Sequence, residues 1–136
     1  MEKTVVIKSY DSPAILKLTN PERHSGQTNV DYFTVTIEGH SLHATLRVYA
    51  FTDGEQLCSL FKDIMDNWKG WEGEKQWQSI EQDFHLSCKS DGLGHVQICS
   101  RLVMRDEKEP WIAEATIQVA SGQLESIARS VCEFFR

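Results

Sequence analysis

The segment Trp68-Lys69-Gly70-Trp71-Glu72-Gly73-Glu74-Lys75-Gln76-Trp77 divides the chain into two blocks and so decides its fold. It holds three of the four tryptophans, follows a stretch with helical periodicity and leads into a run with strand character. Gly70 is a natural helix stop, because glycine readily adopts the left-handed conformation that ends many helices. The segment therefore separates a block of strands and a helix from a second block of the same kind.

The helix before this segment is predicted to begin at Asp53, an N-cap residue with Gln56 three positions later at capping-box spacing. Apolar residues then recur at helical spacing and form one stripe. Its members are Leu57, Leu60, Phe61, Ile64, Met65 and Trp68. We expect this stripe to face the core, with Trp68 as its last buried member.

A hairpin is predicted immediately before that helix. Apolar and polar residues alternate over 33–37 and again over 42–48, which is typical of strands that bury one face. The Gly39-His40 pair suits a two-residue turn, which would set Ile37 opposite Leu42 and bring both apolar faces together.

The second block begins near Trp77 and contains three further runs that alternate. The loops between them set apolar residues opposite one another. The predicted pairs are Cys88 with Val96, Leu86 with Ile98, and Met104 with Trp111. Ser121 caps a final helix. The apolar stripe of that helix is Leu124, Ile127, Ala128, Val131 and Phe135.

With β-rich runs at 4–9 and 14–18, the order of elements is ββββα-βββα. Because each strand has one apolar face and each helix one apolar stripe, we expect a single α+β domain over residues 1–136. It would be a mostly antiparallel sheet of about seven strands with both helices packed on one face. The other face would be polar and open to solvent or to a partner.

The expected registers decide which residues lie on that open face. They place Arg101 opposite Glu114 and Tyr32 opposite Arg47, while His85 lies opposite Cys99. The face is either an ordinary solvated surface or a binding surface. Its candidate binding residues are Tyr32, His43, Arg47, Tyr49, His85, Gln97, Arg101 and Glu114.

Trp71 and Trp77 form a second candidate site. Either they pack over the edge of the sheet and the end of the helix, or they stay partly exposed and anchor a partner, as tryptophan does in many interfaces.

The composition excludes several functions. A net charge of −6 and a pI of about 5.3 oppose binding to nucleic acid, whose phosphates need clustered basic residues. No apolar run approaches the roughly 18 residues of a membrane span. The four cysteines form no Cys-x-x-Cys pair and fall in predicted strands and helices, so we expect free thiols in a reducing cytoplasm.

No catalytic or metal-binding signature is present. There is no Gly-x-Ser-x-Gly elbow and no phosphate-binding glycine loop. Cys99 with His85 is the one Cys/His candidate, and a third metal ligand is not evident. We therefore expect no catalytic residue, no metal and no cofactor, and we favour a protein that is not an enzyme.

Four short motifs connect the chain with a known family. They are Asp31-Tyr32-Phe33-Thr34-Val35, Trp68-Lys69-Gly70-Trp71-Glu72-Gly73, Trp77-Gln78-Ser79-Ile80-Glu81 and Gly94-His95-Val96. In this order and spacing the chain resembles a small uncharacterised bacterial family, domain of unknown function number 6228, from Val5 to Phe135. The resemblance implies a bacterial cytoplasmic protein with this order of strands and helices. It supplies no catalytic residues.

These observations favour a small cytoplasmic module that binds a protein partner, which the acidic charge suggests is basic. The specific version is an immunity-type protein that neutralises a toxin. One alternative is a small-molecule-binding protein or enzyme with a pocket near Trp71 and Trp77. Another is a structural homodimer formed through the sheet, so the chain is expected to be a monomer or a homodimer.

Overall fold

The computed structural model describes residues 3–24, 27–51 and 53–136 and confirms the α+β class. These residues form eight strands and two α-helices in the order ββββα-ββββα, with a short 3-10 turn (η1, Ser121–Gln123) before the second helix. The first unit contains β1 (Thr4–Lys8), β2 (Ile15–Glu22), β3 (Tyr32–Gly39), β4 (Leu42–Tyr49) and α1 (Asp53–Asp66). The second contains β5 (Glu74–Gln78), β6 (Phe84–Ser90), β7 (His95–Met104), β8 (Trp111–Ala120) and α2 (Leu124–Phe135).

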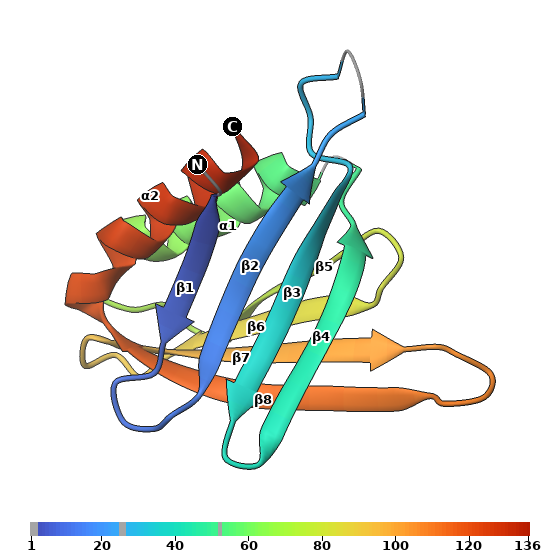
Figure 1. The fold of residues 1–136 in the computed structure, drawn as a ribbon. Helices are drawn as coiled ribbons and strands as arrows, with labels where there is room; N and C mark the ends of the chain where they lie inside the picture. The colour runs from blue at the N-terminus through green and yellow to red at the C-terminus, as the bar shows by residue number, and fades with distance from the viewer. Residues whose placement is uncertain (1–2, 25–26, 52) are drawn as a thin grey trace.

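The strands form two antiparallel sheets, which corrects the expectation of one sheet of about seven strands. The orders are β1-β2-β3-β4 and β5-β6-β7-β8, so neighbours in sequence are neighbours in space. In Figure 1 the first sheet lies in front and its strands cross those of the second. Alternation predicted that each strand buries one face, but two sheets that face each other satisfy that pattern as well as one sheet under two helices.

The apolar core lies between the inner faces of the sheets and the helices. Phe33 of β3, Phe84 of β6 and Phe134 of α2 are all buried. The Phe33 ring meets each of the other two edge-on with its centroid 6.2 Å away. Such edge-to-face contacts add to the free energy of burial. Phe33 therefore joins both sheets and a helix.

The sequence predicted that both helices cover one face of a single sheet, and this prediction is wrong. They pack against each other, with α1 beside β5 and α2 beside β1, so each helix lies next to the first strand of the other unit. Both are on the same side of the molecule (Figure 1). Each helix thus closes the core near an edge strand and needs only one apolar stripe. Neither of the described helices is long and apolar enough to cross a membrane.

The β7–β8 register is confirmed, whereas the other two predicted hairpins are shifted by two residues. Gly39 lies opposite Leu42, so His40 and Ser41 form the first turn, and Ser41 takes the left-handed conformation with φ of 55°. Cys88 lies opposite Ile98 rather than Val96. A shift of two residues leaves every side chain on the same face, so the apolar pattern alone does not distinguish these registers.

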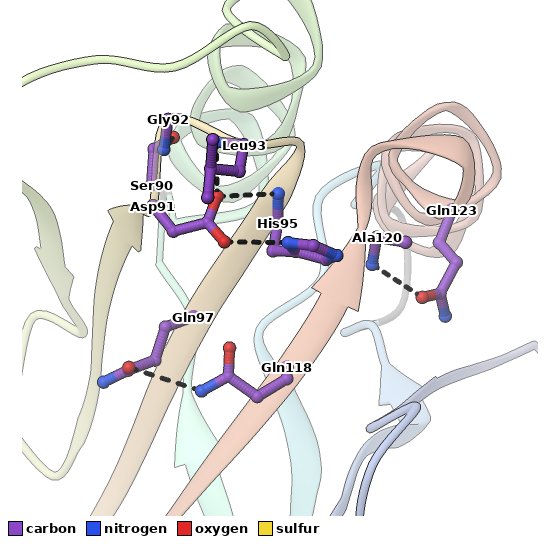
Figure 2. A network of polar contacts seen from close by, with 9 residues as sticks. All are labelled: Ser90, Asp91, Gly92, Leu93, His95, Gln97, Gln118, Ala120 and Gln123. Carbon is purple, nitrogen blue, oxygen red and sulfur yellow. Dashed lines mark hydrogen bonds and ion pairs between the residues drawn. The ribbon is translucent and has the colours of Figure 1, made fainter.

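The loop between β6 and β7 is longer than the turn between β3 and β4, and the side chain of Asp91 organises it (Figure 2). Its carboxylate accepts hydrogen bonds from the backbone N–H groups of Leu93 and His95, at 2.7 and 3.1 Å. The second carboxylate oxygen lies 2.7 Å from Nδ1 of His95. These bonds to the charged form lower the pKa of Asp91, with the Leu93 amide making the largest contribution. The Asp91 side chain therefore fixes the conformation of this loop.

The cysteine prediction is wrong for one pair. Cys58 of α1 and Cys132 of α2 form a disulfide across 74 residues, with their Cα atoms 4.7 Å apart, while Cys88 and Cys99 are free. The sequence did not indicate this bond because nothing in the spacing reports that the two helices pack together. Since disulfides persist in oxidising compartments, the cysteines no longer support the expectation of a reducing cytoplasm.

Trp68 is not the last core residue of the first helical stripe, as predicted. The helix ends at Asp66, and Trp68 is 50% exposed. The side-chain amide of Asn67 donates a hydrogen bond to the backbone carbonyl of Asp63 at 2.8 Å. The backbone N–H of Gly70, which has a φ of 130°, donates to the backbone carbonyl of Asn67. This local turn ends the helix at Asp66, two residues before the end of the predicted apolar stripe at Trp68.

Candidate functional site

The outer face of the second sheet is a grid of polar side chains, which we call the polar face. Three rows cross its four strands, because the registers place one residue of each strand opposite the next. The rows are Glu74, Lys89, Gln97 and Gln118; Gln76, Ser87, Cys99 and Thr116; and Gln78, His85, Arg101 and Glu114. Alternation along each strand sends these residues outward while their neighbours fill the core.

A recess of about 570 Å³ lies over the last two rows of this face. Its lining includes three residues predicted for the open sheet face, His85, Arg101 and Glu114, together with Cys99. Trp77 lines one side, and its indole Nε1 donates a 3.1 Å hydrogen bond to the Gln56 side chain of α1. That bond connects the wall of the recess to the helix.

Trp77 therefore belongs to the recess and also to the core margin, since its ring lies edge-on against Phe84 with centroids 5.4 Å apart. Trp71 does not line the recess. It is half-buried, Lys75 Nζ lies 5.2 Å from its ring centroid, and its Nε1 has no hydrogen-bond partner among the described residues. The two tryptophans that the sequence grouped as one candidate site thus have different surroundings.

Arg101 and Glu114 lie directly opposite each other on β7 and β8, as predicted. Both are exposed, and neither forms an ion pair with any residue in the described part of the chain. The Glu114 carboxylate instead accepts a hydrogen bond from the Cys99 thiol, with 3.1 Å between sulfur and oxygen. The recess thus contains one positive and one negative side chain that do not form an ion pair with each other.

The thiol in the recess is poorly suited to nucleophilic attack. Burial and the hydrogen bond to Glu114 raise the pKa of Cys99, so the reactive thiolate is disfavoured. The predicted His85–Cys99 pair is wrong, because His85 lies opposite Arg101 and Cys99 lies opposite Ser87. A ring nitrogen of His85, Nε2, lies 2.7 Å from the carbonyl oxygen of Gln82, which accepts its hydrogen. This geometry provides no activated nucleophile.

Gln97, the fourth predicted residue of this sheet, lies outside the recess. Its side-chain carbonyl accepts a 3.3 Å hydrogen bond from the Gln118 amide, a cross-strand contact visible in Figure 2. In the same row, Glu74 contacts Lys89 at 3.0 Å. Hydrogen bonds from Lys89, Gln76 and Ser87 lower the pKa of Glu74 to about 2. This row is therefore internally satisfied, unlike the row of Arg101 and Glu114.

The other four predicted site residues lie on a different surface. Tyr32, His43, Arg47 and Tyr49 belong to β3 and β4, on the outer face of the first sheet. The expected single open face is thus divided between two sheets. The division arises because β4 does not pair with β5, and α1 lies between them in sequence.

On the first sheet Arg47 stacks on Tyr32, with its guanidinium carbon 3.7 Å from the ring centroid. Tyr32 lies opposite Tyr49 rather than opposite Arg47, and the two tyrosine rings are 5.2 Å apart. Glu22 binds the guanidinium through both carboxylate oxygens, at 2.8 and 2.9 Å. Glu22 was missed because the second β-rich run was predicted to end at residue 18, whereas β2 continues to Glu22.

Three glutamines of the recess were also missed by sequence reasoning. Gln76 and Gln78 alternate with Lys75 and Trp77, and this short period-2 pattern could have indicated β5 and its outward side chains. Gln56 was assigned only to helix capping, because nothing in the sequence places α1 beside β5. In the residues that the structure describes, no three His, Cys, Asp or Glu side chains gather as a metal site would require.

The molecule thus belongs to the class of small α+β proteins that present a polar sheet face with a recess. Comparison with known families identifies it further. Residues 7–136 match the model of the family of unknown function DUF6228, so the chain belongs to that family, as the motifs suggested. No curated protein matches the chain.

Proposed function

We propose that this chain is a non-enzymatic binding module that recognises a partner protein with its polar face. The observation that carries the proposal is the three-row grid itself, exposed on a four-stranded sheet, with a recess at the rows of Arg101 and Glu114. A rigid backbone holds these side chains in a fixed arrangement, which reduces the entropy lost on binding. An arginine and a tryptophan line the recess, and both are enriched at the centres of interfaces.

Binding is favoured over catalysis by the chemistry of the recess. The raised pKa of Cys99 and the carbonyl contact of His85 leave no nucleophile paired with a base. Arg101, Glu114 and the glutamines offer hydrogen bonds and charge, which are the means of recognition.

The net charge of −6 suggests a basic partner, because complementary charge accelerates association and suppresses wrong partners. The specific form of the proposal is an immunity-type protein that neutralises a basic toxin domain. The small size of the chain and its exposed polar face support this form.

The test first establishes whether a gene beside that of this chain encodes a basic toxin domain, and then titrates that domain with the purified chain; the absence of such a neighbouring gene would count against the immunity-type form. We expect Glu114→Gln to weaken binding by about tenfold at low salt, and less at high salt. Glu38→Gln on the first sheet removes the same charge from the other outer face and serves as the matched control. Equal losses in both variants would exclude the polar face as the contact surface.

A second candidate function is the binding of a small molecule in the recess. It is favoured by the volume of about 570 Å³, which lies in the range of small-molecule sites, and by Trp77 in the lining. The sequence suggested a pocket near Trp71 and Trp77, and the recess includes the second of these. Ligand and partner binding are separable, because a small ligand would bind without any toxin domain.

A further inference from the structure

Arg101 and Glu114 differ from three other pairs of opposite charge on the outer faces of the two sheets. Lys89 reaches Glu74 at 3.0 Å, Lys17 reaches Glu38 at 3.3 Å, and Arg47 is held by Glu22. Arg101 and Glu114 are direct cross-strand neighbours, yet among the described residues neither is within ion-pair distance of an opposite charge. The open pair is also the pair that lines the recess.

The surroundings of the two charges are suited to a polar ligand. Gln56, Gln76 and Gln78 line the same recess, and each amide offers both a donor and an acceptor. The Cys99 thiol donates to one oxygen of Glu114, Oε1, which leaves the carboxylate able to accept from a ligand through its other oxygen. The recess therefore combines a cation, an anion and neutral hydrogen-bonding groups.

A ligand that fills this recess displaces water from both charges at once. A ligand with only a negative charge would satisfy Arg101 and leave Glu114 desolvated and unpaired, and a cation would do the reverse. A ligand with both charges compensates both losses. The Arg101 guanidinium suits a carboxylate, which it can bind through two parallel hydrogen bonds, and Glu114 suits an ammonium.

We propose that the recess binds an amphoteric ligand in which a carboxylate and an ammonium lie close together, as in a free α-amino acid. The same chemistry occurs in a peptide with adjacent acidic and basic side chains. This inference rests on the recess being a ligand site, the second candidate function above, and is independent of a toxin partner.

The experiment measures binding of the twenty free L-amino acids to the full chain by calorimetric titration. A blocked dipeptide, acetyl-Glu-Lys-amide, is the peptide arm. The tightest amino acid is then compared with its N-acetyl and α-amide derivatives, each of which lacks one charge. We expect at least one free amino acid or the dipeptide to bind, and each single-charge derivative to bind at least about tenfold more weakly.

Variants locate the site. Arg101→Gln and Glu114→Gln should each weaken binding by about tenfold or more. Lys17→Gln and Glu38→Gln remove one positive and one negative charge from the outer face of the first sheet, away from the recess, and should leave binding unchanged. Circular dichroism verifies that all four variants fold.

The proposal is overturned if neither the amino acids nor the dipeptide bind, if the single-charge derivatives bind as tightly, or if the control variants lose as much affinity. None of these results decides whether the chain binds a toxin domain, which the separate toxin titration tests. Conversely, amino-acid binding without toxin binding would support this inference and reject the protein partner.

Discussion

Cys58 and Cys132 join the two ββββα units covalently, through helices that each pack beside the first strand of the other unit. The bond closes a loop across 74 residues, and a cross-link over so long a segment strongly restricts the unfolded chain. The two halves are therefore held together both by the shared core and by this disulfide.

Replacing both cysteines should reduce stability. We expect the Cys58→Ser/Cys132→Ser variant to lose about 2–4 kcal/mol in free energy of unfolding, measured by urea denaturation. Cys99→Ser is the matched control, because Cys99 is a free thiol and half-buried. Adding reductant to the native chain should reproduce the loss, and an unchanged midpoint would contradict a stabilising disulfide.

Phe33 should be among the most sensitive core positions. It is fully buried and touches aromatic rings from the second sheet and from α2, so Phe33→Ala opens a cavity where three elements meet. We expect a loss of about 3–5 kcal/mol in the free energy of unfolding. Tyr49→Ala on the outer face of the same sheet should cost at most about 1 kcal/mol. Comparable losses would show that the sheets do not share one core.

Asp53 should make stability depend on pH. Burial raises its pKa from 3.8 to about 6, while the backbone N–H of Ile80 acts in the opposite direction. The folded state thus holds the proton more tightly than the unfolded state, so this contribution is complete below about pH 4 and is lost as the pH rises through about 6. Urea midpoints measured between pH 4 and pH 7 should show this decline.

Asp53→Asn should remove that decline, so the variant gains stability relative to the native chain as the pH rises. Asp66→Asn, at the exposed end of the same helix, is the control and should keep the native profile. A constant difference between native chain and Asp53→Asn at every pH would argue against a buried carboxyl with a raised pKa.

Replacing Trp68 and replacing Trp77 should change the free energy of unfolding by different amounts, because the two side chains have different surroundings. Trp68 is 50% exposed, so Trp68→Ala should change the free energy of unfolding by at most about 0.5 kcal/mol and remove the emission most quenched by iodide. Trp77→Ala should cost about 2 kcal/mol, because its ring packs on Phe84 and its N–H binds Gln56. A reversed order would support the original expectation that Trp68 is a core residue.

Trp71→Phe tests the unpaired indole N–H. The nitrogen is buried without a partner among the described residues, so phenylalanine keeps an aromatic ring and removes a donor whose hydration is lost on folding. We expect stability to be unchanged or slightly increased in thermal unfolding, despite the smaller ring. A loss of more than about 2 kcal/mol would indicate that the N–H is satisfied.

Local patterns predicted much of the fold. Alternation identified the faces of β3, β4, β6, β7 and β8, and the pairing of Arg101 with Glu114 followed from the predicted pairing of Met104 with Trp111. Two hairpin registers were wrong by two residues, since Ser41 and the Asp91 carboxylate decide those turns while the apolar pattern permits either register.

The candidate site was predicted only in part. His85, Arg101 and Glu114 line one recess, but Tyr32, His43, Arg47 and Tyr49 lie on the other sheet. Gln56 joins the recess only because α1 packs beside β5, a contact between elements that no periodicity records.

The sequence by itself determined both helices, seven of the eight described strands and the apolar side of each of those seven, because these depend on residues two to four positions apart. The tertiary structure alone decided that the strands form two sheets, that Cys58 meets Cys132, and that opposite charges remain open in a recess. Those features arise from contacts between distant segments, where several arrangements bury the same apolar faces and only packing of the whole chain selects one.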